Sequence, residues 1–151
     1  MAEIAANLFE SILFVIFLTL FLKPKKEKRV FFCWAFVASA LLFLNITCSD
    51  HFSTYSVYTI LVDFLITLLF WKWSLNGSFP QFFMGFALYW FGLDFSVIIM
   101  LYIFSQYSIE VVEASTSVNA PYRIVCLIFS RILILVYTVI VLYNRAVQTA
   151  A

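Results

Sequence analysis

The sequence predicts an all-α, polytopic membrane protein, a transmembrane helix bundle of about five spans. The first observation behind this prediction is that long apolar segments alternate with short polar ones along the whole chain. The second is that 65% of the 151 residues are hydrophobic and only 11% are charged, whereas soluble domains average about 45–50% and about 25%. A soluble domain of this size has too small an interior for so many apolar side chains. We therefore expect the lipid bilayer to surround the chain.

Helices, rather than the strands of a β-barrel, are expected to cross that bilayer. Barrel strands alternate apolar and polar residues, but residues 12–22 contain a single polar residue, Thr19. Within lipid, backbone N–H and C=O groups can otherwise be satisfied only inside helices. Glu3, with no Lys or Arg in residues 1–6, also argues against a cleaved signal peptide. The first apolar segment is therefore expected to remain as a span.

Polar and charged segments divide the chain into spans. Pro24 and the charges around it end the first span, and the Asn76-Gly77-Ser78 turn precedes the fourth. The fourth span is longer than the roughly 20 residues that a bilayer core requires, so we expect a tilt or an irregularity near Gly92. We predict one transmembrane domain over residues 1–151, with spans at residues 4–22, 30–48, 55–71, 79–104 and 122–143.

The distribution of Lys and Arg predicts the orientation. One side of the membrane would hold most of the basic loop residues, and the other side only Arg123. Because Lys and Arg accumulate in cytoplasmic loops, the N-terminus is expected outside the cell and the C-terminus in the cytoplasm. The net charge of +1 gives no reason to expect nucleic acid as a partner. The basic residues expected on the cytoplasmic side are the cluster Lys23, Lys25, Lys26, Lys28 and Arg29, together with Lys72 and Arg145.

Four ionisable residues within the spans are the strongest candidates for function: Glu10, Asp63, Asp94 and Arg131. A charge at the bilayer centre costs about 2.5–3.5 kcal/mol on insertion scales, so such residues are expected to face the protein interior and to find partners. Helical rise places the last three at a similar depth. We expect an intramembrane polar layer in which Arg131 pairs with Asp94, Asp63 or both. It would be either a structural ion pair or a switch or ion site.

Other sites are few. Asp50, His51, Glu110 and Glu113 are expected in the outer loops, where they could face a ligand. One histidine beside one aspartate does not form a metal site, and neither a nucleophile–base pair nor a phosphate-binding loop is present. We therefore expect no metal, no cofactor and no enzymatic activity. We interpret the three cysteines as buried apolar residues: Cys33, Cys48 and Cys126. Four small residues are expected to permit close contact between helices: Ala35, Ser39, Gly85 and Gly92.

Several short motifs resemble the membrane sensor region of Agr-type sensor histidine kinases of Gram-positive bacteria, in which a GHKL-type ATPase domain follows the sensor. Asp94 stands where an acidic residue often occurs in that family's fourth helix, and Ser130-Arg131 is similar to a Ser-basic pair in its last helix. The Asn76-Gly77-Ser78 turn is similar to the family's short Gly-Ser turn. The first span opens with Asn7-Leu8-Phe9-Glu10 and closes with Phe21-Leu22-Lys23-Pro24-Lys25, as that region does.

The resemblance implies a quorum-sensing receptor in the cell membrane. It would detect an extracellular ligand such as a small peptide and pass the change through the last helix to a dimeric kinase, which implies a homodimer. This chain departs from the pattern because it contains neither a phospho-acceptor histidine helix nor ATP-binding motifs. Two alternatives remain open: a small transporter or substrate-binding membrane component that uses the intramembrane charges, and a membrane scaffold that binds other helices.

Overall fold

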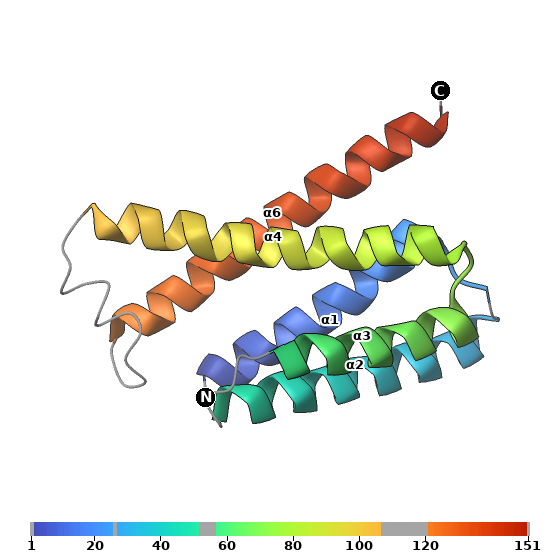
Figure 1. Ribbon diagram of the computed structural model, residues 1–151, viewed down its shortest axis with the longest axis horizontal. Helices are drawn as coiled ribbons and strands as arrows, with labels where there is room; N and C mark the ends of the chain where they lie inside the picture. Colours follow the sequence, from blue (N-terminus) through green and yellow to red (C-terminus); the bar gives the residue numbers. More distant parts are fainter. Residues whose placement is uncertain (1, 26, 52–56, 107–120, 151) are drawn as a thin grey trace. The chain divides into compact units, whose positions relative to one another are not determined.

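The computed structural model describes residues 2–25, 27–51, 57–106 and 121–150, and these residues form five α-helices without a named strand (Figure 1). All five are long and apolar enough to cross a membrane. The prediction of an all-α, multi-pass membrane protein is therefore confirmed. The helices are α1 (Ala2–Leu22), α2 (Lys28–His51), α3 (Val57–Ser74), α4 (Phe79–Ser105) and α6 (Pro121–Ala150).

The helices extend beyond the predicted spans at most ends. α2 continues to His51, although a polar turn was expected from Ser49, and α6 continues to Ala150 rather than ending at Tyr143. The predictions followed the apolar stretch, but a helix does not have to end where the hydrocarbon core ends, because water can also solvate its backbone. α4 runs through Gly92 without interruption, so its length is not relieved by a break at that glycine.

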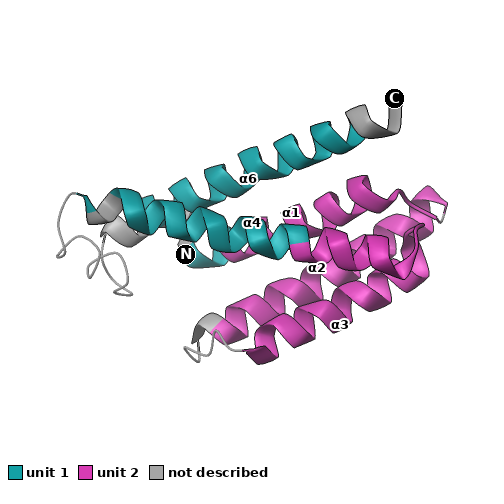
Figure 2. Ribbon diagram, turned by 45° about the horizontal axis from the view of Figure 1, so that its top comes forward, with its two compact units in different colours: residues 1–6, 88–151 teal, residues 7–87 magenta. Residues whose placement is uncertain are grey.

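The chain divides into two compact units, which Figure 2 distinguishes by colour. Unit 2 contains residues 7–87, and unit 1 contains residues 1–6 and 88–151, so that α4 contributes to both.

Within unit 2, aromatic side chains from α1, α3 and α4 pack together. Phe64 of α3 meets Phe86 of α4 edge-on, with ring centroids 5.1 Å apart, and Phe14 of α1 lies 5.7 Å from the same Phe86 ring. Trp71 stacks on Phe82 at 5.3 Å. Such offset and edge-to-face pairs are favourable geometries for rings. They hold the first part of α4 against α1 and α3.

Two loops of unit 2 pair with each other through backbone hydrogen bonds. The amide of Lys25 donates to the carbonyl of Ser74 (2.8 Å), and the amide of Asn76 donates to the carbonyl of Lys23 (2.9 Å). The Asn76 side-chain amide also donates to the carbonyl of Pro24 (3.1 Å). The α1–α2 and α3–α4 loops therefore lie on one side of the membrane, as the charge distribution predicted. We call these paired loops, residues 23–29 and 72–78, the loop clasp.

Candidate functional site

Unit 2 contains a buried polar cluster between α2 and α3, at the point where the sequence placed Asp63. The Asp63 side chain is 1% exposed. The side-chain amide of Asn45 donates one hydrogen bond to Asp63 Oδ1 (2.9 Å) and another to the carbonyl of Thr59 (3.1 Å). Asn45 thus joins two successive turns of α3 to α2.

Helical spacing explains why these groups meet. On α3, Thr59, Asp63 and Thr67 are four residues apart, which places them on one face of the helix, and all three are buried. On α2, Asn45 and Ser49 are also four residues apart, and the Ser49 and Thr59 hydroxyls lie 2.8 Å from each other within hydrogen-bonding distance. α2 and α3 pack side by side (Figure 1). The two polar stripes therefore form one hydrogen-bonded seam.

α1 adds a second carboxylate to this cluster. Glu10 is 2% exposed, and its charge acts on Asp63 through an unfavourable like-charge interaction. Asn7, three residues before Glu10, and Ser11, directly after it, are also buried. Two of the four residues predicted to form the intramembrane polar layer, Glu10 and Asp63, thus belong to one interior region of unit 2.

The other two predicted residues, Asp94 and Arg131, lie in unit 1 and do not form the expected pair. The Asp94 side chain is exposed on α4, and its carboxylate forms no hydrogen bond or ion pair with any residue that the structure describes. The buried face of α4 contains Gly92, Leu93 and Ser96. Asp94 lies two residues from both Gly92 and Ser96, and at 100° per residue this places it away from their face. The prediction considered depth along the helix axis, whereas the exposure of Asp94 depends on the rotation of α4 about its axis.

α4 and α6 are instead joined by a tyrosine that the sequence did not single out. The Tyr137 hydroxyl of α6 donates to the carbonyl of Leu88 on α4 (3.0 Å). The Tyr137 ring lies against Gly92, where an added Cβ atom would overlap the ring. Gly92 therefore provides the notch that admits this ring. We call the contact of Tyr137 with Leu88 and Gly92 the tyrosine notch.

The small-residue pattern indicated one half of this contact. Close helix approach was expected at Gly85 and Gly92, and both are confirmed: a Cβ atom at Gly85 would lie 2.9 Å from Cδ1 of Phe21. Tyr137 is one of eight tyrosines, and nothing in its local sequence distinguishes it as the partner of Gly92. Asn45, Thr59 and Ser49 were missed because uncharged polar residues in apolar segments are less conspicuous than charges.

The remaining predicted residues give a mixed result. Arg131 is half-buried on α6. Glu110, Glu113 and Lys26 lie outside the described residues, as do the side chains of Asp50 and His51. Of the cysteines, Cys126 is buried as expected, but Cys33 and Cys48 are exposed on α2. In a membrane helix an exposed apolar residue faces lipid, so apolar character does not predict burial within the protein.

The described residues contain no group of three or more His, Cys, Asp or Glu side chains that could hold a metal ion. The buried polar cluster can hold helices in register, and its two carboxylates are groups that could exchange protons. A scan against protein-family models, a search of curated proteins and a search of solved structures each find no match.

Proposed function

We propose that the chain is a membrane-embedded sensor and signal-transducing module of the cell membrane, similar to the N-terminal region of a quorum-sensing-type histidine kinase. The ligand would be an extracellular molecule such as a small peptide. It would contact the outer loops, whose expected residues include Asp50, His51, Glu110 and Glu113. The kinases that the chain resembles act as dimers, so the proposal includes a homodimer.

The observation that carries the proposal is the connection between α4 and α6. α6 is one continuous helix of 30 residues, about 45 Å long at 1.5 Å per residue. A helix of this length can convey a small rotation or translation from one membrane surface to the other. The tyrosine notch is the place where α4 acts on it. We infer that ligand binding changes the packing at this notch, a role that the sequence had suggested for Asp94 and Arg131.

The direction of signalling follows from the proposed topology. Five spans with the N-terminus outside place the end of α6 in the cytoplasm, on the same side as the loop clasp. A downstream partner at the end of α6 could then read the change. The mechanism needs two packing arrangements of similar free energy, and the ligand must bind one of them more tightly.

The test is a fusion of the full chain to a reporter kinase after Arg145. The probe is medium conditioned by the organism that carries the gene, compared with fresh medium. We expect reporter output to change with conditioned medium, and to respond less when Gly92→Ala disturbs the notch. Gly85→Ala is the matched control, because it alters the same helix within unit 2. Constant output over fractionated media would contradict the sensor proposal.

The buried polar cluster favours a second candidate, a small membrane transporter. Glu10 and Asp63 are buried carboxylates of a kind that often marks ion or proton pathways in membranes. Transporter sites are usually built at interrupted helices, however, and α4 is continuous at Gly92. Proteoliposome uptake of protons or amino acids that disappears in Asp63→Asn would favour the transporter over the sensor.

A further inference from the structure

The loop clasp of unit 2 gathers basic side chains from two separate parts of the sequence. Its sequence contains six Lys and Arg residues against one acidic residue, Glu27. Lys23 has a backbone φ of 65°, a left-handed conformation that ends α1 and lets the following residues pair with the α3–α4 loop. Lys72, at the end of α3, is thereby placed near the cluster from the first loop. The basic residues with described side chains are all exposed: Lys23, Lys25, Lys28, Arg29 and Lys72.

These five cations have no acidic partner within the described chain. None of their side chains forms an ion pair or hydrogen bond with a described residue, and the Glu27 carboxylate likewise forms none. α2 begins at Lys28 without an acidic residue in its first turn, so the positive end of its helix dipole adds to the same field. The loop clasp therefore carries a concentrated positive charge that no described acidic side chain neutralises.

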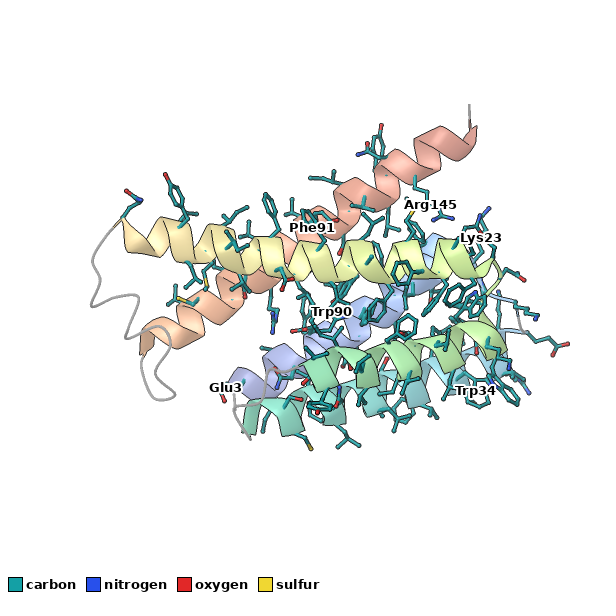
Figure 3. All side chains as sticks on the ribbon, in the orientation of Figure 1. Glu3, Lys23, Trp34, Trp90, Phe91 and Arg145 are labelled. Carbon is teal, nitrogen blue, oxygen red and sulfur yellow. The ribbon has the colours of Figure 1, made fainter. Side chains whose placement is uncertain are left out.

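Two tryptophans indicate the depth of this surface in the membrane. Trp34 of α2 and Trp73 of α3 pack with ring centroids 5.4 Å apart, and Trp73 directly follows Lys72. Figure 3 labels Lys23 and Trp34 near the same end of unit 2. Indole rings concentrate at the level of lipid headgroups. Trp34 lies six residues into α2 from Lys28, about 9 Å along the axis, so the basic residues are at or just beyond the headgroups.

We propose that the loop clasp binds the headgroups of anionic phospholipids, with Lys23, Lys25, Lys28, Arg29 and Lys72 as the contacting cations. Lipid headgroups and free inorganic phosphate both present phosphate groups to such cations. The tryptophan pair places the cations at the depth where lipid phosphates are concentrated, which favours the lipid. Clusters of basic residues beside a span are attracted to anionic lipid, each cation adding roughly a factor of five in affinity. The bound lipid would hold the two paired loops at the membrane surface. This inference does not depend on the sensor proposal.

The experiment measures lipid retention by native mass spectrometry of the full chain in detergent micelles doped with equal amounts of phosphatidylglycerol and phosphatidylcholine. We expect wild type to retain phosphatidylglycerol preferentially. The variant Lys25→Gln/Lys28→Gln/Arg29→Gln should lose at least about ten-fold of that preference, whereas the charge-conserving Lys25→Arg/Lys28→Arg/Arg29→Lys should keep it. Circular dichroism and gel filtration of each variant check that it is folded.

Two further arms keep the result decisive. In wild type alone, rising KCl should reduce the phosphatidylglycerol preference, because salt screens exposed charges; this arm decides the question if the Gln variant does not fold. Millimolar inorganic phosphate should compete only weakly, and complete displacement would assign the surface to free phosphate. Equal retention of both lipids, or a preference unchanged in the Gln variant, would overturn the proposal. Equal retention combined with charge-dependent binding of poly-glutamate would assign the surface to an acidic protein instead.

Discussion

Asp63 is the residue whose sequence interpretation and structural setting agree best. Its charge in an apolar segment predicted burial with a partner, and the side chain is buried against the Asn45 amide. Asp94 looked equivalent in sequence but lies on the exposed face of α4. The difference arises from how each helix is rotated about its axis. A segment that is apolar on every face does not specify which face is buried.

Substitutions at Asp63 should distinguish its hydrogen-bonding role from its charge. Asp63→Ala removes the acceptor of Asn45 and leaves a buried amide without its side-chain partner, so we expect a loss of about 1–3 kcal/mol in unfolding free energy. Asp63→Asn keeps an acceptor oxygen and relieves the repulsion from Glu10, so stability should stay within about 1 kcal/mol of wild type. Thermal unfolding in detergent micelles measures both. Asp94→Asn is the exposed control and should cause no loss; equal losses for Asp63→Asn and Asp63→Ala would contradict this assignment.

Lys23 offers a test of local backbone conformation. A non-glycine residue at φ 65° carries a cost of roughly 1–2 kcal/mol relative to a right-handed conformation. Lys23→Gly should therefore raise thermal stability, by up to about 1 kcal/mol. Lys25→Gly is the comparison, because Lys25 is not among the described residues with positive φ, and it should lower stability. A decrease for Lys23→Gly as large as that for Lys25→Gly would argue against a left-handed end to α1.

At the scale of elements, the sequence predicted the number and approximate position of the helices but little of their pairing. Apolar length and charged loops determine where a span can lie, and all five predicted spans correspond to helices. The tyrosine notch depends instead on which face of α6 meets α4. Gly92 could be identified as a small residue, but Tyr137 required the structure.

The tyrosine notch can be tested by a double-mutant cycle between α4 and α6. Gly92→Ala should destabilise the protein by about 1–3 kcal/mol, because the new methyl group overlaps the Tyr137 ring. Tyr137→Phe should cost about 1 kcal/mol through loss of the hydrogen bond to Leu88. In Tyr137→Ala the methyl group has room, so adding Gly92→Ala to that variant should cost much less than adding it to wild type. Additive effects in thermal unfolding would show that the two residues do not share one contact.

At the scale of the whole molecule, the four residues of the expected polar layer are divided between the two units. Glu10 and Asp63 belong to unit 2, whereas Asp94 and Arg131 belong to unit 1. Counting residues from the ends of spans gave similar depths, but depth alone cannot determine which helices are neighbours. Positive charge was enough to predict that the α1–α2 and α3–α4 loops lie on one side, but their pairing through backbone hydrogen bonds required the structure.

The proposed topology can be tested by cysteine labelling after the three native cysteines have been replaced. Asn76→Cys in the loop clasp and Asn144→Cys near the end of α6 should both resist a membrane-impermeant maleimide in intact cells and react after permeabilisation. Thr116→Cys, expected in the outer loop, should react in intact cells. Labelling of Asn76→Cys and Asn144→Cys from opposite sides would contradict an odd number of spans.

The central claim is that an outside ligand changes the packing of α6 against α4. Spin labels at Phe91→Cys on α4 and Val139→Cys on α6, two exposed positions near the notch, allow their distance distribution to be measured by double electron–electron resonance in lipid nanodiscs. We predict that a conditioned-medium fraction that switches the reporter also shifts this distribution, and that fresh medium does not. An unchanged distribution with a fraction that switches the reporter would contradict the claim that this helix pair carries the signal.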